Sequence, residues 1–265
     1  MPKIKVNGVN LSYERAGQGE PLIFVTGFNA DRHIWDGIFK DYTRLYDAIA
    51  VDNRGCGESD IPDSPYTIEM MADDIIGLCD ALGLQACHFI GISMGSAITM
   101  MIAHKYPHRC KSIVLTNGFR KIDIRFALFA EAQLALRQLK VSSEVLVGSV
   151  LGWCFSSDFL NQPGMVDYLF EAAKTNPAAT SEIGYRNHLS ALLSFDSRAW
   201  IHEITVPTLV IGSDQDMIVP EAEMQAMANL IPGAQYHCFK GVGHCPHIER
   251  PKEYNEVVQK FITTC

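Results

Sequence analysis

The chain has 265 residues, of which 48% are hydrophobic, and it carries 30 acidic against 22 basic side chains, for a formal net charge of −8. This length suits one α/β domain with an insertion, or two domains at most. The acidic balance argues against nucleic acid and anionic membrane surfaces as partners, because both require clustered lysines and arginines.

The first half of the chain alternates apolar runs typical of buried strands with segments of helical spacing. Two short strands are predicted within residues 3–14, around a turn at Asn7-Gly8. Further strands are predicted at 21–25, 48–52, 86–90 and 112–116. Helices are predicted between them at 31–45, 67–82 and 96–106, the second with Thr67 as its N-cap.

The second half interrupts this alternation. Residues 121–200 contain no strand of the core type but four helical segments, at 124–139, 143–154, 166–174 and 181–194. Strands then return at 208–212 and 235–239, followed by helices at 221–230 and 251–262. We therefore predict an α/β fold with a mostly parallel central sheet and flanking helices. Its core comprises residues 1–120 and 201–265, and residues 121–200 form an all-helical cap.

The cysteines and the apolar stretches bear on location. Eight cysteines are scattered without a C-x-x-C pair or a disulfide framework. The first residues have no apolar signal core, and the longest apolar stretch, 145–155, is too short to span a bilayer. We expect a cytoplasmic protein with no membrane partner, and we leave its oligomeric state open.

The pentapeptide Gly91-Ile92-Ser93-Met94-Gly95 lies between a predicted strand and a predicted helix. A G-x-S-x-G sequence in that position is typical of a nucleophile elbow, a sharp turn that exposes the serine Oγ. The glycines allow the strand and helix to cross closely, and the Met94 N–H at the helix start faces a developing oxyanion. The alternative is a glycine-rich turn with a structural serine.

A serine nucleophile requires a base, usually histidine. Among nine histidines, His244 lies in a glycine-rich loop after the last predicted strand, which favours it as the base. His247 is the alternative base, and is otherwise expected to face solvent or cap a helix. His88, His104 and His202 fall inside or beside predicted elements, which favours packing or surface roles.

The base in turn requires an orienting carboxylate. The loop after the strand at 208–212 offers two candidates, Asp214 and Asp216. Their position alone does not separate them, and either could simply form a turn.

Together these motifs resemble the α/β-hydrolase fold family, over essentially the whole chain. The resemblance is to capped serine esterases and lactonases, including members of the β-ketoadipate enol-lactonase, carboxylesterase and non-haem haloperoxidase-like group. The matching stretches are the elbow at 91–95 and the segments 52–59, 214–220 and 243–251. In that family the segment matching 52–59 is structural, and Glu249 and Pro251 would start a helix.

The resemblance also implies roles for individual residues. The family's acid stands four residues before a proline, which corresponds to Asp216 before Pro220. Its second oxyanion donor comes from the loop after the strand at 21–25, which assigns the Phe28 N–H as the partner of the Met94 N–H. The family's usual histidine in this loop is replaced by Thr26, and backbone donors do not depend on that side chain.

The function implied by the resemblance is hydrolysis of a small to medium carboxylic ester or lactone, through a triad of Ser93, His244 and Asp216 and an acyl-enzyme. No cofactor or metal is expected, because the chain has no nucleotide-binding fingerprint and no clustered ligand set. Two alternatives stay open, a hydrolase-fold small-molecule receptor or signalling protein and a cofactor-free lyase that uses the same His-Asp pair.

The apolar side chains of the predicted cap have two possible roles. They either line a substrate cavity, which predicts a substrate with an apolar acyl chain or ring, or pack the cap onto the core. These residues are Phe126, Leu128, Phe129, Leu134, Leu136, Leu151, Trp153 and Phe155.

Overall fold

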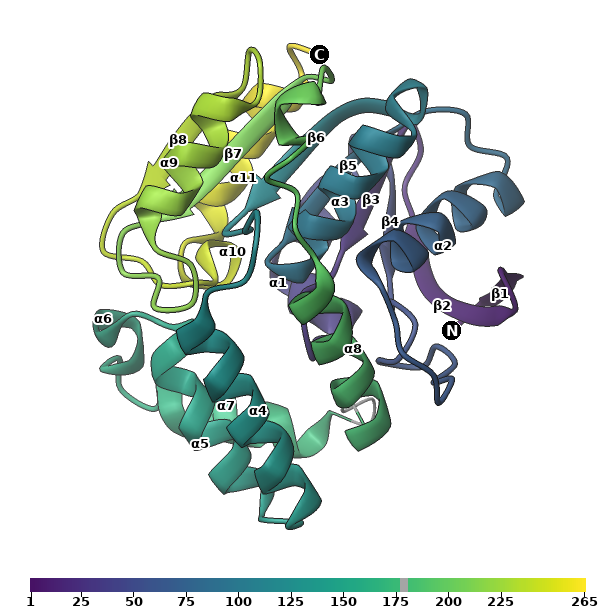
Figure 1. The fold of residues 1–265 in the computed structure, drawn as a ribbon. Helices are drawn as coiled ribbons and strands as arrows, with labels where there is room; N and C mark the ends of the chain where they lie inside the picture. Colours follow the sequence, from purple (N-terminus) through teal and green to yellow (C-terminus); the bar gives the residue numbers. More distant parts are fainter. Residues whose placement is uncertain (177–180) are drawn as a thin grey trace.

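A computed structural model describes residues 1–176 and 181–265, and its centre is one eight-stranded sheet (Figure 1). The strand order across the sheet is β1-β2-β4-β3-β5-β6-β7-β8. The strands are β1 (Lys3–Val6), β2 (Val9–Ala16), β3 (Glu20–Val25), β4 (Tyr46–Val51), β5 (Cys87–Ile92), β6 (Cys110–Thr116), β7 (Thr208–Ser213) and β8 (Gln235–Phe239).

The first two strands differ from the rest in direction. β1 pairs with β2 and β2 with β4 in antiparallel register, whereas β3 to β8 all pair in parallel. The central strands β4, β5 and β7 are buried at every residue, because helices cover both faces of the sheet. Parallel strands bring their carboxyl ends to one edge, so the loops after β3, β5, β6, β7 and β8 meet there.

Two apolar clusters separate the sheet from its covering helices. The first lies under α2 (Ile68–Ala81), α3 (Met94–Lys105) and α9 (Glu221–Leu230). The second lies under α1 (Asp36–Tyr42) and α11 (Pro251–Ile262). Alternate residues of β3 divide between them, with Ile23 and Val25 in the first and Leu22 and Phe24 in the second.

In the described part of the chain between β6 and β7, five α-helices precede the short 3-10 helix η3 (Ile201–Glu203). They are α4 (Ile124–Gln138), α5 (Ser143–Cys154), α6 (Ser157–Leu160), α7 (Met165–Thr175) and α8 (Glu182–Ser194). Figure 1 shows α4, α5 and α7 as a group set apart from the sheet, with α8 leading back toward it. The predicted fold class, a mostly parallel sheet with flanking helices, is confirmed.

The remaining elements are short. They are η1 (Arg32–Trp35), η2 (Pro107–Arg109), η3 (Ile201–Glu203) and α10 (Pro246–Glu249). Neither α6 nor α10 was predicted, because a four-residue helix is too short to show a period. The strand–helix turn at Ser93 is tighter than predicted, since β5 ends at Ile92 and α3 begins at Met94.

Candidate active site

Ser93 is the single residue between β5 and α3, and its backbone is strained. Its φ of 55° and ψ of −119° lie outside the regions that side chains favour, at a cost of about 1–3 kcal/mol. The flanking glycines permit this turn. A Cβ on Gly91 would lie 2.4 Å from the Gly95 carbonyl oxygen, and one on Gly95 would lie 2.2 Å from that of Val25. This geometry matches a nucleophile elbow.

His244 and Asp216 form a buried pair. The ring Nδ1 of His244 lies 2.6 Å from Asp216 Oδ2. The other carboxylate oxygen, Oδ1, accepts from the backbone N–H groups of Ile218 and Val219 at 2.7 and 2.9 Å. With Nδ1 engaged, Nε2 is the ring nitrogen that can take a proton from a nucleophile.

Two opposing effects act on the pKa of His244. Burial disfavours the charged imidazolium, whereas the charge of Asp216 and the hydrogen bond to it favour it. The carboxylate outweighs burial, so the pKa of His244 lies above its ordinary value. A base with this raised pKa accepts a proton readily and is neutral only above that pKa.

The structure separates the two candidate acids. Asp214 accepts a hydrogen bond from the Gly241 backbone N–H at 2.7 Å and lies 3.9 Å from Lys240 Nζ. Its side chain therefore joins two loops, rather than bonding within its own turn as the alternative interpretation expected. Only Asp216 contacts His244 through its side chain.

His247 does not face solvent, contrary to one sequence-based expectation. It is 2% exposed in α10, and its ring lies 4.8 Å from that of Trp35 and 5.9 Å from that of Tyr254. Burial and the nearby charge of His244 lower the pKa of His247 to about 3, so it stays neutral as part of the core.

The three histidines for which packing or surface roles were predicted lie in other parts of the molecule. His88 is buried in β5 beside Ser112, with 2.8 Å between Nδ1 and Oγ. His104 stacks on Trp200 at 4.3 Å between ring centroids, and His202 is exposed.

The end of β6 connects Ser93 with the His244 loop. The Ser93 N–H donates to the Thr116 carbonyl at 2.9 Å. The next residue, Asn117, donates from Nδ2 to the His244 carbonyl at 2.9 Å and to Ser213 Oγ at 3.0 Å. Sequence reasoning missed Asn117, although a polar residue directly after a buried strand at this edge was the available signal.

The loop after β3 lies against the elbow. A Cβ on Gly27 would lie only 3.4 Å from Ser93 Cβ. Thr26 is fully buried, and Asn53 Nδ2 donates to its carbonyl and its hydroxyl at 3.1 and 3.0 Å. Thr26 thus anchors the loop in which its neighbour Gly27 lies against Ser93. The use of the Phe28 N–H as an oxyanion donor stays a prediction.

Aromatic side chains from α4 and α8 cover this loop, and Trp153 of α5 packs against those of α4. The Phe28 ring lies 4.6 Å from that of Tyr185 and 6.3 Å from that of Phe126, between centroids. Phe129 and Trp153 stack on each other at 4.5 Å. Leu128 neither lines a cavity nor packs inward, because its side chain is 60% exposed on the outer side of α4.

The last residue of α5 and the segment after it are bonded to the loop of His244. The His244 N–H donates to the Cys154 carbonyl at 2.9 Å. The Glu249 carboxylate accepts from Gly243 N–H at 2.9 Å, Ser156 N–H at 3.0 Å and Ser156 Oγ at 2.5 Å. Glu249 was expected only to help start a helix. Instead it ends α10 and bridges two segments, whereas Pro251 does begin α11.

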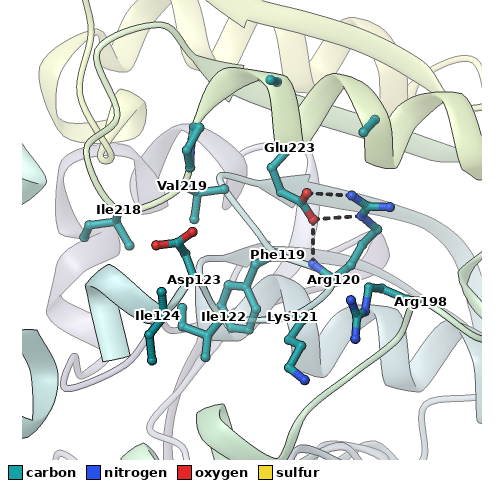
Figure 2. Close-up of a pocket in the computed structure, with 13 residues that line it drawn as sticks. Phe119, Arg120, Lys121, Ile122, Asp123, Ile124, Arg198, Ile218, Val219 and Glu223 are labelled. Atoms are coloured by element: carbon teal, nitrogen blue, oxygen red, sulfur yellow. Dashed lines mark hydrogen bonds and ion pairs between the residues drawn. The ribbon is translucent and has the colours of Figure 1, made fainter. Parts of the chain in front are cut away.

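A cavity of about 510 Å³ lies beside the Asp216 loop, where the chain passes from β6 to α4 (Figure 2). Arg120 donates to Glu223 of α9 through N, Nε and Nη2, at 3.1, 2.8 and 2.6 Å. Ile218 and Val219 line the same cavity. Because the ion pair satisfies its own charges, we assign it a structural role, joining the end of β6 to α9.

The described ranges 1–176 and 181–265 contain neither a cluster of metal ligands nor a membrane-spanning helix. No three His, Cys, Asp or Glu side chains there come together as metal ligands. No helix in these ranges has the length and apolar content needed to cross a membrane.

Comparison with known proteins connects this geometry to a family. Residues 20–251 match the family described as alpha/beta hydrolase fold. The pyrrolizixenacetamide deacetylase of Xenorhabdus hominickii is 28% identical over 99% of this chain and 98% of its own. The 3-oxoadipate enol-lactonase 2 of Acinetobacter baylyi is 28% identical over 95% of this chain and 92% of its own.

A solved structure gives the same result. The enol-lactonase from Burkholderia xenovorans LB400 superposes with a TM-score of 0.86 at 26% identity, covering 99% of this chain and all of the other. The resemblance inferred from the motifs is confirmed, and the chain belongs to the α/β-hydrolase fold family.

Proposed function

We propose that the protein is a serine hydrolase that cleaves a small to medium carboxylic ester or lactone. The observation that carries this proposal is the arrangement at the carboxyl edge of the sheet. Ser93 occupies a strained elbow hydrogen-bonded to the end of β6, and the same end of β6 holds the loop of His244, which is paired with Asp216.

In the proposed reaction, Ser93 Oγ attacks the substrate carbonyl carbon while its proton passes to Nε2 of His244. Asp216 stabilises the resulting imidazolium through its 2.6 Å contact with Nδ1. The N–H groups of Phe28 and Met94 bind the oxyanion of the tetrahedral intermediate. His244 then protonates the leaving oxygen, which in a lactone stays attached to the acyl group.

Release of the acyl group repeats these steps with water. His244, neutral again, removes a proton from a water molecule as the water oxygen attacks the acyl-enzyme carbon. The second tetrahedral intermediate collapses, the Ser93 oxygen leaves and takes its proton back from His244, and the carboxylic acid departs.

The relatives support the class of reaction. Deacetylase and lactonase are both names for enzymes that cleave at an acyl carbon, and the relatives with these names cover nearly the whole chain. We propose further that residues 121–200 form a cap over the site and that the protein works in the cytoplasm. The free state of all eight cysteines supports this location.

The test is turnover of p-nitrophenyl esters of increasing acyl length and of simple lactones, by the wild-type protein and by Ser93→Ala. We expect turnover that the substitution reduces by about 10⁶-fold in kcat. Turnover that survives Ser93→Ala would favour a lyase that uses the His-Asp pair. Folded wild-type protein without turnover would favour a receptor.

A further inference from the structure

Two of the eight free cysteines lie together beside the proposed base. Cys154 is the last residue of α5, and Cys245 follows His244 directly, just before α10. Their thiols are joined by a side-chain hydrogen bond. The proposed hydrolysis uses neither sulfur, so this pair of thiols needs an explanation of its own.

Backbone contacts hold the two cysteines near each other. The His244 N–H donates to the Cys154 carbonyl at 2.9 Å. A Cβ on Gly243 would lie 2.8 Å from the Phe155 carbonyl carbon and 2.9 Å from the Cys154 carbonyl oxygen. The end of α5 and the loop of His244 therefore touch backbone to backbone. The two sulfurs belong to segments that are already fixed against each other.

A second pair of thiols provides an internal comparison. Cys79 of α2 and Cys87 of β5 have their sulfur atoms 3.9 Å apart. Each of them is only 1% exposed, inside the first apolar cluster. Cys154 and Cys245, in contrast, are both partly exposed to solvent. Contact between thiols is common to the two pairs, but only the pair at the base can meet a dissolved oxidant.

Cys154 is the more nucleophilic thiol of its pair. The hydrogen bond with Cys245 lowers the pKa of Cys154, and the charge that His244 can carry acts in the same direction, against burial. The same hydrogen bond, together with burial, raises the pKa of Cys245. The thiolate is the form that attacks an oxidant, so oxidation starts at Cys154 and Cys245 stands ready to complete it.

We propose that Cys154 and Cys245 are a peroxide-sensitive site, at which a reversible disulfide forms and switches off hydrolysis. The disulfide would tie the end of α5 to the residue that follows the base. Formation of this cross-link is independent of the proposed function, whereas its effect on turnover rests on that function.

The reaction needs hydrogen peroxide and no cofactor. The Cys154 thiolate attacks one peroxide oxygen, so that an S–O bond forms, the O–O bond breaks and hydroxide leaves. The Cys245 sulfur loses its proton and attacks the Cys154 sulfur, so that the S–S bond forms, the S–O bond breaks and a second hydroxide leaves. The two thiol protons convert both hydroxides to water. The thiols lose two electrons, which the peroxide gains, and a dithiol reverses the change by thiol–disulfide exchange.

The cross-link should displace the base. Disulfide sulfurs are about 2.05 Å apart, whereas the thiols in contact at Cys79 and Cys87 are 3.9 Å apart. Closing such a gap pulls Cys245, and with it the neighbouring His244, relative to Asp216. Because a displacement of about 1 Å in a catalytic group can cost about 10²-fold in rate, we expect kcat to fall by at least about tenfold.

Peptide mapping of the wild-type protein tests the cross-link without using activity. The reduced protein is treated with hydrogen peroxide, denatured, alkylated and digested with trypsin without a reductant. Cys154 and Cys245 are each the only cysteine of their tryptic peptides, 141–174 and 241–252. We expect these two peptides to be joined and to separate on addition of dithiothreitol. Cys79 and Cys87, in peptide 55–105, should be alkylated and serve as the internal control.

Two variants test the order of the steps. Cys245→Ser should stop at the sulfenic acid of Cys154, which dimedone traps. Cys154→Ser should form neither the sulfenic acid nor the cross-link, and should keep its own activity through the peroxide treatment. The wild-type protein should lose kcat and regain it with dithiothreitol, which does not reverse methionine oxidation. Cys265→Ser removes an exposed cysteine and should behave as the wild type does.

The outcomes separate this inference from the proposed function. If no joined peptide forms, or if Cys154→Ser is inactivated as fully as the wild type, the inference is wrong and ester hydrolysis is unaffected. A joined peptide with unchanged kcat would overturn the switch. If the peptide forms as expected while the reduced protein turns over no ester, the oxidation site stands and the proposed hydrolysis fails.

Discussion

The two sides of Ser93 are held by different kinds of interaction. On the base side, directional hydrogen bonds hold the loop of His244, which accepts from Asn117 and donates to Cys154 and Glu249. On the side of the proposed oxyanion donor, hydrogen bonds from Asn53 hold the start of the loop at Thr26, and Phe28 is covered by the rings of Phe126 and Tyr185. Hydrogen bonds fix a geometry, whereas ring contacts tolerate small displacements. We therefore expect the base to be rigid and the oxyanion loop to follow the helices that cover it.

The largest effect should come from removing the carboxylate charge on the base side. Asp216→Asn keeps an oxygen for the N–H groups of Ile218 and Val219 but favours the wrong tautomer of His244. We expect kcat to fall by about 10⁴-fold, as in other triads. The matched control is Asp214→Asn, which should change kcat less than about threefold. If both variants lost kcat equally in ester hydrolysis, the assignment of Asp216 as the acid would be wrong.

Gly95 tests the rigidity of the elbow. A Cβ there would lie 2.2 Å from a backbone oxygen, so Gly95→Ala should lower the free energy of unfolding by about 3 kcal/mol. Gly152→Ala is the control, because a Cβ on this residue of α5 meets nothing within 4 Å. It should stabilise by up to about 1 kcal/mol. Urea denaturation measures both, and an unaffected Gly95→Ala protein would show that the elbow can relax.

Glu249→Gln tests the bridge between Ser156 and the loop of His244. The substitution removes a charge that accepts three hydrogen bonds, so we expect kcat to fall by about tenfold. Glu253→Gln, four residues further on at the exposed start of α11, is the control and should have no effect. An unchanged kcat in Glu249→Gln would mean that the base does not depend on this bridge.

Phe126→Leu tests the oxyanion side. The smaller side chain loses the edge-to-face contact with Phe28, whose centroid distance is 6.3 Å. A loosened loop should lower kcat by about three- to tenfold, consistent with about 0.5–1.5 kcal/mol for one ring pair. Because His244 is untouched, the pH profile should keep its midpoint. A shifted midpoint would show that the two sides are coupled.

The smallest effect concerns pH. Only neutral His244 acts as a base, so kcat/KM should fall as pH drops through its pKa. Because the charge of Asp216 outweighs burial, the midpoint should lie above the ordinary value of 6.5. In Asp216→Asn the midpoint of the pH profile of kcat/KM should move to lower pH. A wild-type midpoint below 6.5 would show that burial of His244 outweighs the charge of Asp216.

Much of the fold was predictable because its signals are local. The predicted helices at 143–154 and 251–262 match α5 and α11 residue for residue, since each has clear boundaries in sequence. The elbow could be recognised for the same reason, because its glycines and serine are consecutive. The choice of Asp216 over Asp214 required the family resemblance, since both share one loop.

The features that escaped prediction depend on contacts between distant segments. Glu249 meets Ser156 across 93 positions, and Arg137 meets Asn29 across 108. The sequence around either residue contains no pattern that would indicate its partner. His247 was misjudged because a histidine near a helix start gives no sign that Trp35 will pack on it.

The hydrogen bond from His244 to the Cys154 carbonyl has a consequence for protein engineering. Relatives of one fold invite exchange of their helical insertions, with the aim of transferring substrate preference. Here a graft that replaced residues 154–156 would also replace Cys154, whose carbonyl accepts a hydrogen bond from the His244 N–H. It would replace Ser156 as well, which is the partner of Glu249. The junction of a chimaera should therefore lie in α5 before Cys154, so that residues 154–156 stay together with their native core.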